Sequence, residues 1–407
     1  MTESKGHKLL RVGVVGAGRM GRHHARIYRE LDGCELIAVI DKDLSRAQEV
    51  CAQYGGRAAA RFSDVAGNVD AISVAVPTVY HAEVAIPLME RGIPVLVEKP
   101  LAQDTQSARQ LLEASRRLGC LLQVGHSERF NPVVQAMLRM GVQPRFIETQ
   151  RVSPFTFRSA DIGVVFDMMI HDIDIVLHLA EEATRRRDEG TKGRRDDEDG
   201  TEARRHEGTE WKDEGTKGQR GEGADPQSAI NWQSAIGNRQ SEESAIGRRY
   251  TIDAVGVNVL GDCEDVANAR VRFAGGAVAN LTASRLALKT ERRIRVFCPT
   301  AYLTMDYQKK TGIAIKLSDN LDLVRMARER NFEDLSQMAA LDYGSMVKIE
   351  PLVVDDVEPL RAEIEAFVHS VRTDSAAAVS AEEGYAAVEM AERITHAVRE
   401  QGLAILT

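Results

Sequence analysis

Several features that mark whole classes of proteins are absent or scarce in this sequence of 407 residues. The five cysteines are scattered and odd in number, and no two of them form a Cys-x-x-Cys pair. This excludes a disulfide scaffold and a cysteine-based zinc site, and it favours a reducing cytoplasm. No apolar run approaches the roughly 18 residues that a membrane span needs. The short polar segment 1–8 also lacks the apolar core of a signal peptide.

The sequence has no surplus of positive charge either. It carries 53 lysines and arginines against 61 aspartates and glutamates, which gives a net charge of −8. Nucleic-acid-binding proteins usually carry a basic surplus, so this balance argues against one. Hydrophobic residues make up 43% of the chain and charged residues 28%, so most of it can bury a core, and the length suggests two or three domains.

One segment, residues 185–249, differs sharply in composition from the rest of the chain. It contains no Leu, Val, Phe or Tyr, and its 14 Lys/Arg and 15 Asp/Glu give a local charge of −1. The peptide Asp-Glu-Gly-Thr-Lys-Gly occurs in it at 188–193 and again at 213–218. A segment this poor in apolar side chains cannot offset the entropy of ordering its backbone. We therefore predict a disordered insertion here, and the alternative is a charged arm that binds a partner.

The first 125 residues alternate short apolar runs with helical patterns. The runs are apolar on both faces, which indicates a parallel sheet covered by helices on both sides. The predicted strands are residues 10–15, 35–40, 71–76, 94–97 and 121–124. One helix is predicted from the glycine turn at 16–21 to residue 31, and a second from the end of strand 35–40 to about residue 54. Two more are predicted at 80–91 and 104–118. This order predicts a doubly wound α/β domain of Rossmann type over residues 1–125.

The remaining residues, 126–407, follow a different pattern. A strongly apolar helix is predicted at 163–180, and alternating runs beyond segment 185–249 predict an antiparallel sheet. The predicted strands are residues 252–260, 266–273, 277–284 and 292–298, with closing helices near 359–372 and 381–400. This part of the chain is therefore predicted to be an α+β domain that the insertion interrupts.

The hexapeptide Gly16-Ala17-Gly18-Arg19-Met20-Gly21 has the spacing Gly-x-Gly-x-x-Gly. It follows a predicted buried strand, opens a helix, and is followed 20 residues after Gly21 by Asp41 at the end of the second strand. This context indicates a dinucleotide-binding loop, and the alternative is a turn that only connects two elements. Gly16 permits the tight turn, and Gly18 lets the backbone approach a diphosphate. Asp41 would accept from ribose hydroxyls and repel a 2′-phosphate, which favours NAD over NADP.

Two further strand ends are expected in the same crevice, because ligands of open parallel sheets bind at the carboxyl ends of the strands. Glu98-Lys99-Pro100 closes one strand, and a partly desolvated Lys99 could act as an acid or a base. Val76-Pro77-Thr78 closes another strand, and His81 lies on the helix that follows. The alternatives are a solvent-facing lysine and a hydrogen-bonded histidine at a helix start.

The helix predicted at 163–180 is almost wholly apolar apart from a stripe of acids and histidines. Asp167, His171, Asp174 and His178 are spaced by four, three and four residues, so they share one helix face. Asp167 and His178 would lie roughly 16 Å apart along the axis, so one site cannot use all four. Asp167 and His171, one turn apart, suit a carboxylate-oriented imidazole. The alternatives are a structural stripe and a metal site, for which no third well-spaced histidine is evident.

These motifs, in this order, resemble the Gfo/Idh/MocA family of NAD(P)-dependent sugar oxidoreductases. The matching features are Gly16–Gly21, Asp41, Pro77-Thr78 with His81, Glu98-Lys99-Pro100, and Asp167-x-x-x-His171. The resemblance spans the chain except residues 185–249. It implies a Rossmann domain followed by an α+β domain with a large, mainly antiparallel open sheet, through which family members commonly form homodimers or homotetramers.

The resemblance also implies roles for individual residues. Lys99 would stabilise a developing alkoxide, Asp167 would orient the catalytic groups, and either His171 or Lys99 would be the formal base. The implied cofactor contacts are Gly16, Gly18, Arg19, Met20, Gly21, Asp41, Pro77, Thr78, His81, Glu98 and Lys99. The implied substrate contacts are Lys99, His126, Arg129, Asp167 and His171. No metal is expected.

Two stretches, residues 124–132 and 292–297, are similar to a branch of the family that acts on nucleotide-linked amino sugars. This similarity implies NAD-dependent oxidation of the 3-hydroxyl of UDP-N-acetylglucosamine to a ketone. Arg129 is a candidate to bind the substrate diphosphate, with Lys289, Arg292 and Arg293 as other candidates, and a surface-loop arginine is the alternative. Two rival functions remain, another sugar or inositol dehydrogenase and a non-enzymatic NAD-binding sensor. Neither a nucleic acid nor a membrane is expected as a partner.

Overall fold

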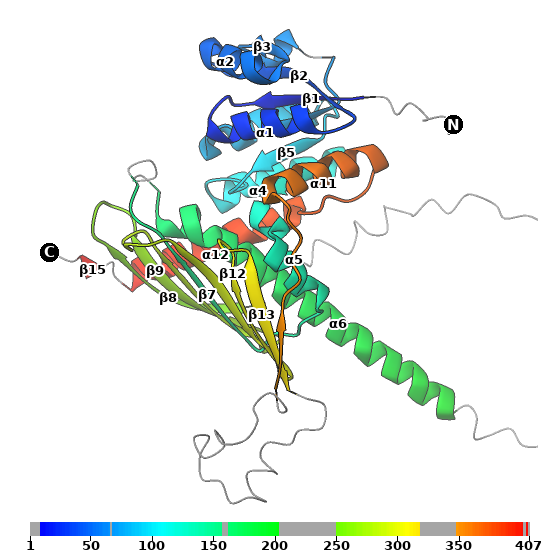
Figure 1. The fold of residues 1–407 in the computed structure, drawn as a ribbon, viewed down its shortest axis with the longest axis vertical. Helices are drawn as coiled ribbons and strands as arrows, with labels where there is room; N and C mark the ends of the chain where they lie inside the picture. Colours follow the sequence, from blue (N-terminus) through cyan, green and yellow to red (C-terminus); the bar gives the residue numbers. More distant parts are fainter. Residues whose placement is uncertain are drawn as a thin grey trace, which may run out of the picture.

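The chain is built around two β-sheets, one above the other in Figure 1. This computed structural model describes residues 9–65, 67–156, 162–202, 250–317, 347–401 and 404–405, and of residues 187–202, 317, 347 and 404–405 it describes the backbone alone. Within this described part of the chain, the first sheet has six strands and the second has nine. No helix in the described ranges is long and apolar enough to cross a membrane.

The first sheet is parallel throughout and has the strand order β3-β2-β1-β4-β5-β6. Its strands are β1 (Leu10–Val15), β2 (Cys34–Ile40), β3 (Arg57–Ala59), β4 (Ala71–Val74), β5 (Val95–Glu98) and β6 (Leu122–Gly125). The helices between them are α1 (Arg19–Glu30), α2 (Leu44–Tyr54), α3 (His81–Met89) and α4 (Thr105–Leu118). Consecutive residues Leu96 and Val97 are both fully buried because helices cover both faces. The Rossmann prediction is confirmed, and the order reverses between β1 and β4, where such sheets bind ligands.

The second sheet is mainly antiparallel, as predicted, with parallel pairing only between β7 and β10 and between β8 and β15 among its described strands. Its order is β14-β13-β12-β11-β7-β10-β9-β8-β15. The strands are β7 (Phe146–Val152), β8 (Tyr250–Asn258), β9 (Val266–Phe273), β10 (Val278–Ser284), β11 (Glu291–Phe297), β12 (Ala301–Asp306), β13 (Thr311–Leu317), β14 (Val347–Pro351) and β15 (Ala404–Ile405). Buried side chains of one sheet face pack against the helices α6 and α12.

The helix predicted at 163–180 differs from the observed one at both ends. It begins with a π-helical turn, Val165–Met169, and continues as α6 (Ile170–Glu202), which projects from the molecule in Figure 1. The helix therefore runs past residue 185, where the sequence predicted the start of a disordered insertion. Glu182 pairs along the helix with Arg185 and Arg186, which supports helix here. Residues 203–249 lie outside the described residues.

The two C-terminal helices, predicted near 359–372 and 381–400, pack partly on the Rossmann domain. Helix α11 (Pro359–Thr373) contributes the buried Ile364 and Phe367 to the same core cluster as Ile27 and Tyr28 of α1. Helix α12 (Ala381–Glu400) places Tyr385 in the core around β5 and β6 and further residues in the core of the second sheet. The sequence placed the domain boundary at residue 125. The packing differs from this division, because α11 contributes side chains to the core of the Rossmann domain.

Candidate active site

The glycine loop between β1 and α1 has the geometry that the sequence predicted for it. Gly16 has a φ of +100°, and a Cβ atom there would lie 2.5 Å from the main-chain oxygen of Ala75. A Cβ on Gly21 would lie 1.7 Å from the main-chain oxygen of Gly16. No atom lies within 4 Å of a Cβ built on Gly18, which is exposed. Gly16 and Gly21 thus allow close packing, whereas Gly18 leaves space for a ligand.

The N-terminus of α1 and the carboxylate of Asp41 both border this space. No side chain caps the helix start at Gly18, so its first N–H groups are available to an anion such as a diphosphate. Asp41 accepts the N–H of Ala17 through Oδ2 at 2.7 Å and the N–H of Asp43 through Oδ1 at 2.9 Å. Asp41 therefore holds the loop closed, and each carboxylate oxygen keeps a lone pair for a ribose hydroxyl. These residues fit a dinucleotide.

The end of β4 is tied to the end of β5 by His81. Its Nε2 lies 3.0 Å from the main-chain oxygen of Val76, and its Nδ1 lies 3.1 Å from that of Pro100 and 3.2 Å from that of Leu101. The side chain is buried, and burial lowers its pKa. The geometry supports the alternative of a hydrogen-bonded histidine that joins two crevice loops, while Pro77, which precedes it, is exposed.

Lys99 follows the last residue of β5 and reaches across to the second domain. Its Nζ donates to the main-chain oxygen of Asp167, in the π-helical turn, at 3.1 Å. Burial lowers the pKa of Lys99, and the charges of Asp167 and Glu98 oppose this effect. Lys99 is therefore not the solvent-facing lysine of the alternative interpretation. A lysine whose pKa is lowered can exchange a proton more readily near neutral pH.

Two imidazoles, the buried His126 and the partly buried His171, lie in the electrostatic field of Lys99. His171 follows the π turn at the start of α6, and His126 follows the last residue of β6. Burial lowers the pKa of His171 well below 6.5, and the charge of Lys99 lowers it further. Burial also lowers the pKa of His126. Neither nitrogen of His126, nor Nδ1 of His171, has a hydrogen-bond partner among the described residues. The predicted Asp167–His171 carboxylate–imidazole pair is therefore not formed among the described residues, and these ring nitrogens keep unused hydrogen-bonding capacity.

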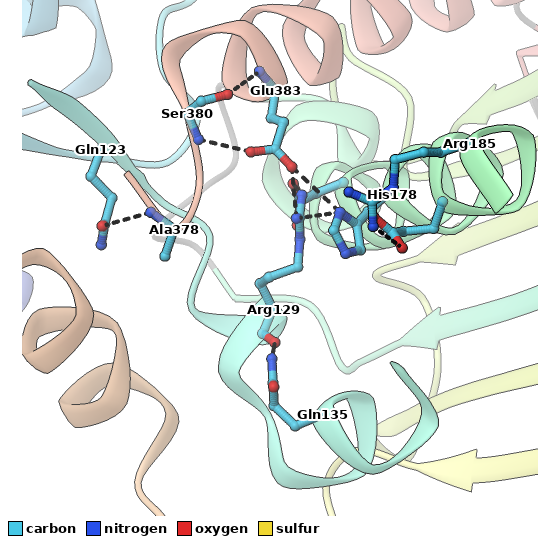
Figure 2. A network of polar contacts seen from close by, with 10 residues as sticks. Gln123, Arg129, Gln135, His178, Arg185, Ala378, Ser380 and Glu383 are labelled. Atoms are coloured by element: carbon cyan, nitrogen blue, oxygen red, sulfur yellow. Dashed lines mark hydrogen bonds and ion pairs between the residues drawn. The ribbon is translucent and has the colours of Figure 1, made fainter. Parts of the chain in front are cut away.

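Arg129 lies inside the protein and its guanidinium is already engaged (Figure 2). It donates to both oxygens of Asp174, at 3.0 and 2.6 Å, and to Oε1 of Glu383 at 2.8 Å. Its Nη1 also lies 2.7 Å from Nδ1 of His178. Burial would raise the pKa of Glu383, but the bonds from His178 and Arg129 lower it overall. Arg129 is thus 4% exposed rather than a surface arginine, and its guanidinium is bonded to protein groups.

A second buried ion network, which the sequence did not reveal, borders the site. Arg151 on β7 donates to Asp172 at 2.9 and 3.0 Å, and to Oε1 of Glu128 at 3.1 Å. Arg292 on β11 shares that Glu128 oxygen at 3.4 Å. The positive charges of Arg151 and Arg292 both lower the pKa of His171. One signal in the sequence could have indicated this network. Side chains alternate between the two faces of a strand, and this alternation places Arg151 on the buried face of β7.

The structure therefore divides the predicted polar stripe. Asp167 accepts a hydrogen bond from Lys99 and His171 lies in the electrostatic field of Lys99, whereas Asp174 and His178 bind Arg129. The active-site candidates come from both domains and meet at the carboxyl end of β5, adjacent to the glycine loop's crevice. A lysine and two uncharged imidazoles at such a place can move a proton and stabilise an oxyanion.

Comparison with known proteins matches both parts of the chain. Residues 10–126 match the NAD-binding Rossmann fold of the Gfo/Idh/MocA oxidoreductases, and residues 151–405 match the C-terminal alpha/beta domain of that family. The UDP-N-acetylglucosamine 3-dehydrogenase of Acidithiobacillus ferrooxidans is 30% identical over 303 residues, covering 74% of this chain and 75% of that protein. A solved structure of that enzyme has a TM-score of 0.70 at 26% identity, covering 96% of this chain and 97% of the other. The inositol 2-dehydrogenase of Corynebacterium glutamicum is 33% identical over 185 residues, covering 42% of this chain and 55% of that protein.

Proposed function

Because the chain belongs to the Gfo/Idh/MocA family of oxidoreductases, we propose that it oxidises the 3-hydroxyl of UDP-N-acetylglucosamine to a ketone with NAD. The observation that carries the proposal is the meeting of Lys99, His171 and His126 at the crevice of a dinucleotide-binding domain. The relative that acts on this sugar nucleotide is similar over about three quarters of both chains, whereas the inositol enzyme is similar over 42% of this chain and 55% of its own.

The chain's own residues can supply the proton chemistry of such an oxidation. NAD, when bound, accepts the hydride. Neutral His171 is placed to take the hydroxyl proton, and the Lys99 ammonium stabilises the oxygen as negative charge develops on it. The main-chain oxygen of Asp167 holds Nζ of Lys99 in place. His126 has two unpartnered ring nitrogens and supplies a further hydrogen bond to the sugar.

The charge next to these groups suits a substrate that carries a diphosphate. Arg292 of β11 lies opposite Arg151 of β7 in the strand register, and both side chains are on the same sheet face as the buried Ile294. Helix α6 covers that face, so Arg292 is on the side of His171. Arg293, the next residue of the strand, points to the opposite face. Of the arginines considered from the sequence, Arg292 is the one directed toward the site.

The surroundings of Arg292 leave it able to bind an anion. Its side chain is 47% exposed, and its ion pair with Glu128 is long and shared with Arg151. Burial and the charge of Arg151 both lower the pKa of Arg292, so an approaching diphosphate would relieve the repulsion. An arginine binds phosphate oxygens through two parallel donors. These properties favour a nucleotide-linked sugar over a free polyol.

The test is NAD reduction by the purified full-length protein with UDP-N-acetylglucosamine, other UDP-sugars, free N-acetylglucosamine and myo-inositol. We expect the highest kcat/KM with UDP-N-acetylglucosamine, because the remote nucleotide supplies binding energy that the free sugar lacks. Mass spectrometry of the product should show the loss of two hydrogens and locate the ketone at C3. A higher kcat/KM with myo-inositol would replace this proposal by that of an inositol dehydrogenase.

A further inference from the structure

Three ionisable side chains from distant parts of the chain meet at the residue that precedes Lys99. His24 lies on α1, Glu98 is the last residue of β5, and Glu363 lies on α11. Their exposed fractions are 0%, 7% and 0%, and one nitrogen or oxygen atom of each lies within 4.8 Å of the others. The sequence assigned Glu98 to cofactor binding, but its carboxylate turns into this pocket instead.

The contacts in the pocket leave one carboxyl group without donors. Nε2 of His24 lies 2.9 Å from Oε1 of Glu98, and the other oxygen of Glu98 accepts the main-chain N–H of Lys99 at 3.2 Å. Both side-chain oxygens of Glu363 are buried without a hydrogen-bond partner among the described residues, and so is Nδ1 of His24. An ionised carboxylate in such surroundings is very unfavourable. Glu363 therefore needs either a proton or a bound cation.

The geometry favours the proton over a cation. Nε2 of His24 and Oε1 of Glu98, which a divalent cation would have to separate in order to bind either of them, already share a hydrogen at 2.9 Å. Burial raises the pKa of Glu363 well above its usual value, and the charge of Glu98 raises it further. Burial also acts to raise the pKa of Glu98, but the hydrogen bond and charge of His24 outweigh it and lower the pKa. Asp174 also raises the pKa of Glu363, and Tyr28 of α1 lies within its field.

We propose that this cluster is a positioning device for Lys99, in which Glu363 is kept as a neutral acid and His24 holds Glu98 as the single negative charge behind the lysine. The hydrogen bond from the main-chain N–H of Lys99 to the carboxylate of Glu98 holds the backbone of the lysine. The main-chain oxygen of Asp167 holds its Nζ. Glu98, together with Asp167, counters the burial of the ammonium, so its charge affects how readily Lys99 gives up a proton. The inference rests on the proposed function only in that Lys99 acts in the reaction.

The protonation of Glu363 can be measured without any substrate. Infrared spectra of the full-length protein at about pH 8, where carboxyl groups are ordinarily ionised, should show the carbonyl stretch of a protonated carboxylic acid. Glu363→Gln should remove this band, and Glu365→Gln, on the exposed side of the same helix, should not. If the band is absent, or if the wild type holds one equivalent of metal that Glu363→Gln loses, the proposal is overturned.

The effect on Lys99 is measured by NMR titration of protein carrying ¹⁵N-labelled lysine, with the signal assigned through Lys99→Met. Glu98→Gln removes the negative charge, so the pKa of Lys99 should fall by about one pH unit or more. Glu363→Gln replaces one neutral group by another, so the pKa should stay within about 0.3 of the wild type, in contrast to Glu98→Gln. A large shift in Glu363→Gln, or none in Glu98→Gln, would overturn the proposal. If Glu98→Gln does not fold, the infrared result decides. A protein that passes both measurements but leaves UDP-N-acetylglucosamine unoxidised would contradict only the proposed function.

Discussion

Nζ of Lys99 donates a hydrogen bond to the main-chain oxygen of Asp167 at 3.1 Å, and this bond joins the two domains. The donor follows β5 of the Rossmann sheet, and the acceptor lies in the π-helical turn that precedes α6. A π turn interrupts the regular i to i+4 pairing, and such turns often occur at functional sites. The position of the lysine therefore depends on the packing of one domain against the other.

Replacing either principal catalytic candidate should reduce turnover. Lys99→Met removes the ammonium and His171→Ala removes the imidazole, so each should lower kcat by at least about 100-fold, as is usual for a lost acid–base group. NAD affinity should change little, because the glycine loop and Asp41 are untouched. Steady-state kinetics and cofactor titration measure both quantities.

The matched control for His171 is His396, an exposed histidine of α12 with 70% side-chain accessibility and an ion pair to Glu400. His396→Ala should turn over like the wild type. Near-normal kcat in His171→Ala or in Lys99→Met would remove that residue from the proposed chemistry.

Arg292 should matter for the nucleotide part of the substrate. Arg292→Ala should raise KM for UDP-N-acetylglucosamine by about 10-fold or more, because charged hydrogen bonds contribute roughly 1.5–3 kcal/mol each. The effect on a slow free sugar should be small, since a free sugar has no diphosphate. Arg293→Ala, on the opposite face of the same strand, is the control. An equal rise in KM for both substrates would indicate that the substitution disturbs the structure in general.

The cluster around Arg129 should contribute to stability. Arg129→Met removes one partner of a buried ion network and leaves Asp174 buried without its partner, which usually costs about 3–5 kcal/mol of unfolding free energy. Arg139→Met breaks the exposed pair with Asp355 and should cost about 1 kcal/mol or less. Urea unfolding of both variants measures the difference. Retained stability with a raised KM in Arg129→Met would restore its predicted role in diphosphate binding.

Features that depend on nearby residues could be predicted from the sequence. The glycine loop and strands that are apolar on both faces are such local signals, and they gave the Rossmann domain and the order of its elements. Strand β7 was not predicted, because polar residues such as Glu148 and Arg151 occur on both of its faces. Arg151 is stable in an inward position because Asp172 and Glu128 pair with it, and those contacts exist only in the folded chain.

The composition of the site depended still more on long-range contacts. The even spacing of the polar stripe did not reveal that Asp174 would bind Arg129, which precedes it by 45 residues. The cluster behind Lys99 joins residues separated by up to 339 positions (363 − 24), so no local pattern marks it. Only the return of α11 onto the Rossmann sheet brings Glu363 there.

Cofactor preference should follow from Asp41. The wild type should bind NAD more tightly than NADP, because a carboxylate at the ribose repels a 2′-phosphate. Asp41→Asn removes the charge but keeps an acceptor for the Ala17 N–H, so it should narrow the ratio of the two affinities. Asp41→Ala should also weaken NAD binding, because the loop loses that bond. Fluorescence titration of both cofactors measures this, and a wild-type preference for NADP would contradict the assignment.

Stability should decline below about pH 6.5, because burial keeps three histidines uncharged in the folded chain. Burial lowers the pKa of His171 well below 6.5 and lowers those of His126 and His81 in the same direction. The unfolded chain therefore binds protons in this range that the folded chain does not, and the free energy of unfolding falls as the pH falls. The stabilisation is complete above about pH 6.5, the ordinary histidine value, and is lost as the pH falls toward the folded-state pKa values.

Urea unfolding between about pH 5 and pH 8 tests this linkage, since each such histidine contributes up to about 1.4 kcal/mol per pH unit. His126→Gln removes one titrating group from a pocket where both of its ring nitrogens lack partners, so the decline on acidification should be shallower than in the wild type. His396→Gln changes an exposed ring and should leave the decline unchanged. If the slope of His126→Gln equals that of the wild type, His126 takes up its proton in the folded protein as readily as in the unfolded chain. In that case it is not the uncharged ring that the proposed sugar contact requires.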